Sequence, residues 1–279
     1  RCIDSVLAQR YDDVEIIVLD DASSPPFATS HDVHVLRSDT RLGLARVRNT
    51  LMEAASGELM LILDADAYLD HPDALRRIAD TFNRHPDLGI LALRIVDYRK
   101  DQTRILTPHS RSERRRDQTL PDRAHRASYF VGPGHAIRRS VIDRIGGFDE
   151  VLDYGQDELD MAYRALAAGY TIRYTPQVIV HHAPPAREKR DKTEAAWRLH
   201  YLTRNRILFA YKHLPIRYAM AYVGTWLGWY GWQAIRSGLP GTYIRAVRAG
   251  WADRQQLLRA PLPEPTQTYL KAHYGRLWR

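Results

Sequence analysis

A short apolar stretch that ends on two acids constrains this chain more than any other feature. Residues 59–63 are all apolar and have turn-forming residues on both sides, so they predict a short strand buried on both faces. Asp64 and Asp66 follow, and side chains two apart in extended backbone point to the same side. Because ligands of open parallel sheets bind beyond the carboxyl ends of the strands, these acids mark a candidate site.

Two interpretations fit this acid pair. Two carboxylates suit Mg²⁺ or Mn²⁺ when water and the oxygens of a diphosphate supply the other ligands. The alternative is that the first acid starts a turn and the second caps the next helix. A second unit of the same kind favours the metal, because residues 14–19, rich in β-branched side chains and apolar apart from Glu15, predict another buried strand that runs into Asp20 and Asp21.

Strands and helices alternate along the first part of the chain. We expect helices over residues 2–9, 41–55 and 72–84, and strands over residues 14–19, 33–36, 59–63 and 89–96. This alternation predicts an α/β domain with a mainly parallel sheet flanked by helices.

The order of the motifs resembles that of the family 2 glycosyltransferases. The resemblance covers residues 1–182 and rests on residues 1–9, 18–23, 43–49, 63–66, 129–139, 145–150 and 154–164. It implies the GT-A fold, a nucleotide-binding α/β domain that transfers a sugar from an activated nucleotide donor. Members of the family have a strand before the helix that opens this chain. We expect that strand to be missing here, which would leave a sheet edge exposed.

The resemblance implies roles on the donor side of the site. Asp64 and Asp66 would hold a divalent cation, Mn²⁺ or Mg²⁺, and with it the donor diphosphate. The donor-binding candidates are Asp20, Asp21, Arg48, Asp64 and Gly132, the last in a small-residue turn beneath the sugar. A histidine at the end of residues 176–182 would approach the metal, and both His181 and His182 are candidates. The alternative for them is a strand end that faces solvent.

A second group of acids opens a later helix, at Asp157, Glu158 and Asp160. Acids in a first turn also simply oppose the positive end of the helix dipole. An inverting transfer needs a general base for the acceptor hydroxyl, and the family's Glu-Asp pair falls here in reversed order. We therefore favour Glu158 as the base, with Asp157 next and Asp160 as a structural residue.

The basic residues suggest where the acceptor binds. The chain has 41 Lys and Arg against 33 Asp and Glu, a net charge of +8, which suits an anionic membrane or a phosphorylated substrate. Residues 97–128 are rich in arginine and predict either a solvated loop or a mobile basic loop near the acceptor. Residues 186–192 predict a charged linker or lid.

We expect two parts along the chain. Residues 1–185 would form the GT-A catalytic domain that the resemblance implies, without its first strand, and residues 186–279 would form a helical, aromatic and basic region. Residues 218–235 have no charged residue and four Trp or Tyr side chains near their end, which predicts an interfacial helix on an anionic leaflet. A helix packed on the catalytic domain is the alternative. The tail, with prolines at 261, 263 and 265, should be extended and then form a short basic helix.

We thus expect an inverting glycosyltransferase that moves a sugar from a nucleotide-diphosphate donor to a glycan or lipid-linked acceptor, with peripheral membrane contact and without nucleic acid. A nucleotidyltransferase and a non-catalytic basic binding module are the alternatives. Uridine, guanosine and thymidine diphosphate sugars are all possible donors.

The single cysteine, Cys2, and the lack of a signal peptide favour the cytoplasm, at the inner face of the membrane, and we expect the sequence to start inside a longer protein.

Overall fold

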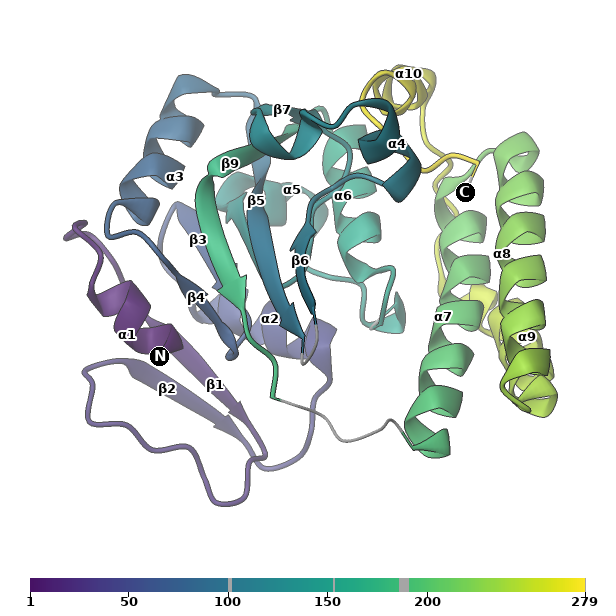
Figure 1. Ribbon diagram of the computed structural model, residues 1–279, viewed down its shortest axis with the longest axis horizontal. Helices are drawn as coiled ribbons and strands as arrows, with labels where there is room; N and C mark the ends of the chain where they lie inside the picture. The colour runs from purple at the N-terminus through teal and green to yellow at the C-terminus, as the bar shows by residue number, and fades with distance from the viewer. Residues whose placement is uncertain (100–101, 153, 186–190, 279) are drawn as a thin grey trace.

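The structure is a computed structural model that describes residues 1–99, 102–152, 154–185 and 191–278. Its strands are β1 Ile17–Asp21, β2 His34–Ser38, β3 Leu59–Leu63, β4 Ala67–Leu69, β5 Leu88–Arg99, β6 Gln102–Leu106, β7 His125–Ala127, β8 Gly134–Arg138 and β9 Thr171–His182. Its α-helices are α1 Cys2–Leu7, α2 Leu44–Ala54, α3 Ala74–Arg84, α4 Arg111–Arg116, α5 Arg139–Ile145, α6 Asp157–Ala167, α7 Lys192–His213, α8 Ile216–Arg236, α9 Pro240–Asp253 and α10 Glu264–Ala272. Figure 1 shows the sheet between α3 on one side and α5 and α6 on the other.

The main sheet is mixed. Its order in the described residues is β3-β8-β5-β9-β4, with β6 paired to β5 and β7 to β9. Only β5 and β9 pair in parallel there, so the α/β class is confirmed but the prediction of a mainly parallel sheet is wrong. One reason is that β6 follows β5 closely in the sequence, and a short connection cannot form the crossover that a parallel pair needs.

Strands β1 and β2 form a separate parallel pair. In the described part of the chain, the only strand that pairs with β1 is β2, and the only strand that pairs with β3 is β8. Each of these two strands therefore has one edge without a strand partner among the described residues.

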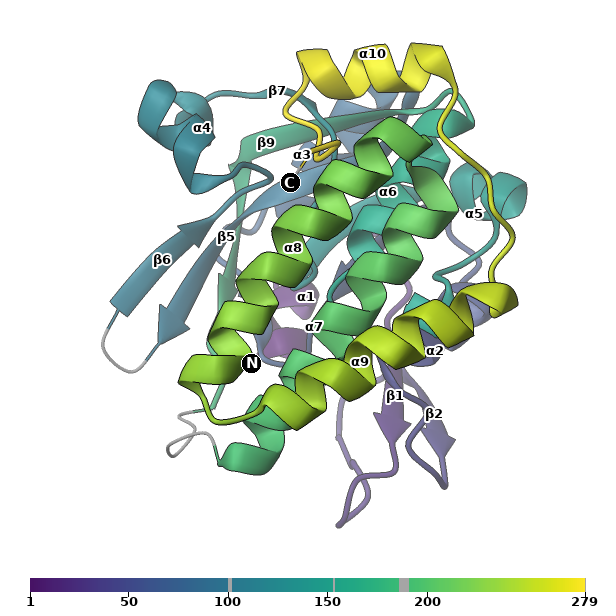
Figure 2. The same ribbon diagram turned by 90° about the vertical axis from the view of Figure 1, so that its right-hand side faces the viewer.

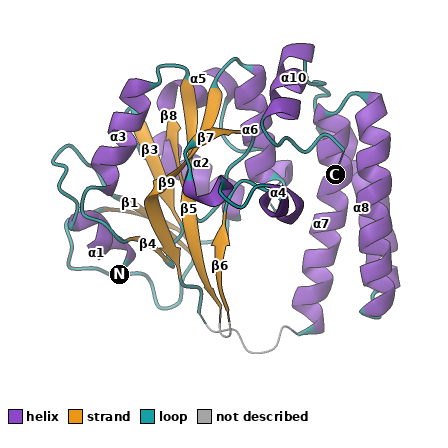
Figure 3. Cartoon of the chain, turned by 45° about the horizontal axis from the view of Figure 1, so that its top comes forward, coloured by secondary structure: helices purple, strands orange, loops and turns teal. Residues whose placement is uncertain are grey.

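Strand β5 shows why the sheet is buried on both faces. Its side chains alternate: Leu91 and Leu93 pack with Phe82 of α3, while Ile90 packs with Met161 of α6 on the opposite face. All are at most 1% exposed. Figure 3 shows the strands enclosed by helices in this way. The near-continuous apolar sequence of this strand is what a doubly covered central strand requires.

The Arg-rich segment is more ordered than predicted. The interpretation of residues 97–128 as a loop is wrong, since β5 extends to Arg99 and the segment then forms β6, α4 and β7. Helix α4 begins with a capping box in which Ser110 and Glu113 satisfy each other's backbone N–H groups. This places arginines of α4 in a defined orientation.

The C-terminal helices pack on the rest of the chain. Figure 2 shows α7 and α8 side by side with α9 crossing them, and α10 above. Phe209, Tyr222 and Leu270 belong to the same apolar core as Met161. The predicted extended tail and short final helix are confirmed in outline, because residues 257–263 are not helical and α10 follows. Two details are wrong: Pro265 lies inside α10, and that helix, with Glu264 and Lys271, is not basic. The division of the chain at residue 185 stays a prediction, and residues 186–190 of the predicted linker lie outside the described residues.

Helix α8 combines features of both interpretations of residues 218–235. Tyr218 and Tyr222 are buried against the core, whereas Met220, Trp232 and Ile235 are exposed. None of the described helices is long and apolar enough to pass through a membrane.

Candidate active site

Strand pairing brings the predicted metal ligands together. Asp64 and Asp66 lie in the turn between β3 and β4, and β4 pairs with β9 so that Ala67 faces His182. One ligand atom from each of Asp64, Asp66 and His182 lies within 4.8 Å of the others. The His182 Nε2 atom is 3.2 Å from Asp66 Oδ1. These three side chains form one cluster at the edge of the sheet.

The structure separates the two candidate histidines. His182 is held by Asp97, a buried residue of β5 whose Oδ1 lies 2.7 Å from His182 Nδ1. His181 points away, stacked between Tyr68 and Tyr98 and bonded to the Tyr98 hydroxyl at 2.8 Å. Only His182 joins the acid pair.

Asp97 was not predicted from the sequence. It follows the apolar residues of β5, as the acids follow β3, and that repetition is the signal that could have found it. A carboxylate that holds one ring nitrogen of a histidine leaves the other for a metal. Asp66, and then Asp97, raise the pKa of His182 through their hydrogen bonds.

The donor set fits a divalent cation. Among the described residues no Lys or Arg forms an ion pair with Asp66, and Asp64 has only Arg48, at 3.7 Å. Burial and the nearby Asp66 carboxylate raise the pKa of Asp64. Two carboxylates and an imidazole form a set that Mn²⁺ accepts, Mg²⁺ less readily.

The acids of α6 differ among themselves in exposure. Asp157 is 1% exposed, and its Oδ2 accepts a hydrogen bond of 2.8 Å from Arg48 Nη1. Burial, and then the neighbouring Glu158, raise its pKa well above the ordinary value. The Glu158 side chain is 24% exposed and lines a cavity. Of the two candidate bases, Glu158 is the accessible one.

Asp160 is fully buried and held by two cations and a histidine. Arg164 Nε lies 2.8 Å, Lys212 Nζ 2.6 Å and His213 Nε2 2.7 Å from its carboxylate. Although burial alone would raise the pKa of Asp160, these partners lower it. These contacts tie α6 to α7, as expected of a structural residue.

Arg48 lies between the two groups of acids. This residue of α2 is buried, bonds to Asp157, and has Nη atoms 3.7 Å from both Asp64 and Glu158. Its Nε has no hydrogen-bond partner in the structure. The predicted contact with the donor stays a prediction; the observed contacts are with carboxylates.

Gly132 permits this close packing. A Cβ atom added at this glycine would overlap the Glu158 carboxylate and lie 3.0 Å from Arg48 Nη2. A side chain here would therefore displace the candidate base.

Asp20 and Asp21 hold loops beside β1. Asp20 accepts hydrogen bonds from the backbone of Ser23 and Phe27 and pairs with Arg37. A hydrogen bond from the Ser23 side chain, followed by the one from the Phe27 backbone, lowers the pKa of Asp20 to about 2. Asp21 Oδ1 accepts from the backbone N–H of Leu42 at 2.7 Å. Within the described residues neither acid pairs with Arg48, so a nucleotide contact for them remains a prediction.

Similar sequences agree on one class of protein. The curated relatives include a pre-mycofactocin glycosyltransferase of Mycobacterium tuberculosis, 30% identical over 61% of this chain and 37% of that protein. A poly-beta-1,6-N-acetyl-D-glucosamine synthase of Staphylococcus epidermidis is 25% identical over 63% of this chain and 44% of the relative. The chain thus spans less than half the length of these relatives.

Solved structures share the fold. A mannosyltransferase of Pyrobaculum calidifontis, in complex with GDP-Man and Mn²⁺, aligns over 97% of this chain and 73% of its own, with a TM-score of 0.54 and 21% identity. TarS of S. aureus with UDP-GlcNAc aligns over 98% and 87%, with a TM-score of 0.56 and 13% identity. The GT-A fold class predicted from the sequence is confirmed.

The family assignment rests on the match to a family model. The family described as glycosyl transferase family 2 matches residues 1–146, more than half of the 279 residues and the part that contains Arg48, Asp64, Asp66 and Gly132. The chain belongs to glycosyl transferase family 2.

Proposed function

We propose that this protein is an inverting, metal-assisted glycosyltransferase that moves a sugar from a nucleoside diphosphate donor to a hydroxyl of a glycan or lipid-linked acceptor. The observation that supports it best is the convergence of Asp64, Asp66 and His182 within 4.8 Å, beside the accessible carboxylate of Glu158. Family membership and donor-bound structural neighbours support the same reading.

The donor side of the mechanism uses the strand-end cluster. Asp64, Asp66 and His182 would hold a divalent cation, which when bound stabilises charge that develops on the leaving diphosphate. Asp97 orients the His182 ring, and Arg48 supplies a fixed positive charge beside Asp64. The imidazole ligand favours Mn²⁺ over Mg²⁺.

The acceptor side uses the accessible acid of α6. Glu158 takes the proton of the acceptor hydroxyl as that oxygen bonds to the anomeric carbon and the bond from this carbon to the diphosphate oxygen breaks. Attack opposite the leaving group inverts the anomeric configuration. Asp157 is the second candidate for the base, but Arg48 and burial restrict its carboxylate.

The choice of nucleotide in the donor rests on a weaker observation than the catalytic residues do. Two structural neighbours were solved with GDP-Man and UDP-GlcNAc, so sugar donors with guanosine or uridine diphosphate should be tested first.

The exposed Trp232 and Ile235 beside Arg236 support contact with the inner face of a bacterial membrane. Sedimentation with anionic vesicles tests this contact. The proposed membrane contact is refuted if Trp232→Gln sediments with the vesicles as the unaltered protein does.

A donor screen tests the proposed function. The protein is incubated with each nucleoside diphosphate sugar and Mn²⁺, Mg²⁺ or EDTA, and release of the nucleoside diphosphate is measured. We expect release from one donor, dependent on the metal, and a product of inverted anomeric configuration by NMR. Release of pyrophosphate from a nucleoside triphosphate and a sugar phosphate would instead favour a nucleotidyltransferase. A non-catalytic binding module would release nothing.

A further inference from the structure

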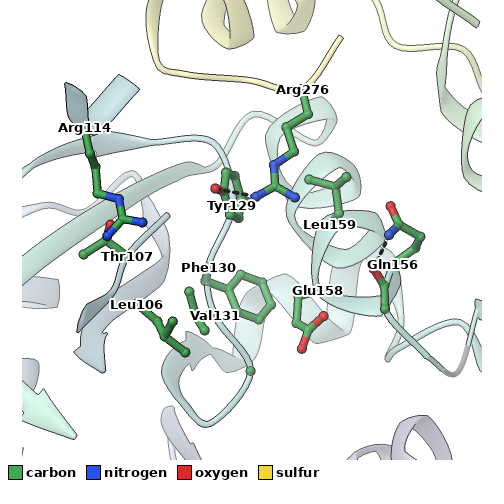
Figure 4. Close-up of a pocket in the computed structure, with 12 residues that line it drawn as sticks. Leu106, Thr107, Arg114, Tyr129, Phe130, Val131, Gln156, Glu158, Leu159 and Arg276 are labelled. Atoms are coloured by element: carbon green, nitrogen blue, oxygen red, sulfur yellow. Dashed lines mark hydrogen bonds between the residues drawn. The ribbon is translucent and has the colours of Figure 1, made fainter. Parts of the chain in front are cut away.

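A second feature of the site is a cavity next to Glu158. It has a volume of about 260 Å³, and the residues that matter for its chemistry are Thr107, Arg114, Tyr129, Gly132, Glu158 and Arg276. Whole small-molecule sites start at about 300 Å³, so this cavity suits one part of a ligand. In Figure 4, Glu158 lies at the bottom of the cavity, Arg276 at the top and Arg114 at the left.

The two arginines of this cavity lack acidic partners. Arg114 Nη1 donates to the carbonyl of Ile105 at 3.1 Å, and its buried Nε has no hydrogen-bond partner. Arg276 Nη2 donates to the Tyr129 hydroxyl at 2.6 Å, and its guanidinium lies 4.0 Å from the centre of that ring. Within the part of the chain that the structure describes, neither has a carboxylate within ion-pair distance. Arg48, the other arginine of the site, does.

The C-terminal segment holds Arg276 firmly in place. Its backbone N–H donates to the Tyr163 hydroxyl at 2.8 Å, and the next residue, Leu277, is 2% exposed. Trp278 packs edge-on against Tyr218 of α8. Arg114 is held in turn by its place on the capped helix α4. Both cations are therefore oriented by the fold before any ligand arrives.

Partly buried cations without counter-charges are costly unless an anion completes the site. The planar guanidinium matches phosphate oxygens with paired hydrogen bonds. A ligand whose phosphate lies near these arginines is attracted by their positive charge, and Glu158 on another side of the cavity can accept a hydrogen bond from a hydroxyl of the same ligand.

We propose that this cavity binds a phosphate group of the acceptor and thereby presents a neighbouring hydroxyl to Glu158. This inference rests on the proposed function and adds the class of acceptor, a phosphate ester of a sugar. The phosphate can belong to a lipid-linked sugar or to a phosphorylated glycan. The C-terminal segment then forms part of the acceptor site through Arg276.

Titration calorimetry with inorganic phosphate tests the site directly. EDTA is present throughout, so that no metal can recruit phosphate to the donor cluster. Arg276→Gln and Arg114→Gln should each weaken phosphate binding about tenfold, the loss expected for one charge-assisted hydrogen bond. Arg115→Gln is the matched control, because it removes the same charge from an exposed position of α4 outside the cavity. Arg276→Lys should recover part of the affinity.

Three results would overturn this inference: no phosphate binding by the unaltered protein at millimolar concentration, equal binding by all variants, or equal loss in the Arg115 control. Thermal unfolding verifies that each variant is folded. Hexose 1-phosphate and decyl phosphate then distinguish the sources, since a lipid-linked acceptor should favour the alkyl ester. Asp66→Asn should abolish nucleotide release but keep phosphate binding, which separates a failure of this inference from a failure of the proposed function.

Discussion

The two acid clusters of the site are built in opposite ways. At the strand ends, Asp64 and Asp66 are partly exposed, and their nearest cationic partners are a histidine and an arginine 3.7 Å away. At the start of α6, Asp157 and Asp160 are buried and each is bonded directly to cationic side chains of the chain itself. Acids whose charge the protein already neutralises hold structure together. Acids left without such partners are available to an added cation.

Arg48 and Glu158 share features of both clusters. Arg48 links Asp64 of one cluster to Asp157 of the other, and Glu158 is the member of the α6 group that keeps solvent access. The comparison therefore supports three proposed roles: cation binding at the strand ends, proton transfer at Glu158 and structural support at Asp160. The following substitutions test these assignments, from the largest expected effect to the smallest.

Glu158→Gln tests proton transfer. The amide cannot accept the acceptor proton, so the rate of sugar transfer should fall by about 10²- to 10⁴-fold. Mn²⁺ affinity should not change, because the side chain is not in the strand-end cluster. Glu150→Gln, at an exposed residue paired with Arg46, is the control and should transfer sugar normally. A transfer rate close to that of the control would move the base to Asp157.

Asp160→Asn tests the structural role of Asp160. Loss of the buried charge removes the carboxylate partner that the described residues give Arg164 and one of the two partners of Lys212, and the free energy of unfolding in urea should fall by about 3 kcal/mol. Because the pKa of Asp160 is lower folded than unfolded, its contribution is present above about pH 4 and is lost as the pH falls below this. The difference between variant and unaltered protein should thus shrink from pH 5 to pH 3.

The control for this substitution is Asp143→Asn at an exposed position of α5. It should change the free energy of unfolding by less than about 0.5 kcal/mol. An equal effect of both substitutions would contradict a structural role specific to Asp160.

Asp97→Asn tests the support of the metal ligand. The altered residue no longer holds the His182 ring through a charged oxygen, and Mn²⁺ affinity by calorimetry should fall by about 10- to 100-fold. Asp87→Asn, just before the other end of β5, should leave that affinity unaltered. Equal Mn²⁺ affinity in both variants would mean that Asp97 supports only the fold.

Local patterns were enough to predict the acid clusters and most elements. Asp64 and Asp66 follow an apolar strand directly, so their position at a sheet edge depends only on neighbours in sequence. The capping box at Ser110 and Glu113 is also a local signal, and it indicates α4 inside the segment interpreted as a loop. Charge-rich composition concealed it.

The features that the sequence analysis missed depend on contacts between residues far apart in the sequence. The choice of His182 over His181 depends on the register of β4 with β9, and the contact of Asp97 with His182 depends on β5 beside β9. Arg48 and Asp157 are 109 residues apart, and no local pattern indicates that they meet. The mixed sheet was missed for the same reason.

The most direct test of the central claim compares Asp66→Asn with Asp70→Asn, an exposed acid four residues away that lies outside the cluster. The measurement is metal-dependent release of nucleoside diphosphate from the donor identified in the screen. If the strand-end acids hold the catalytic cation, Asp66→Asn should lose about a hundredfold or more in rate, and Asp70→Asn should stay within about twofold. Normal metal-dependent release by Asp66→Asn would contradict the account.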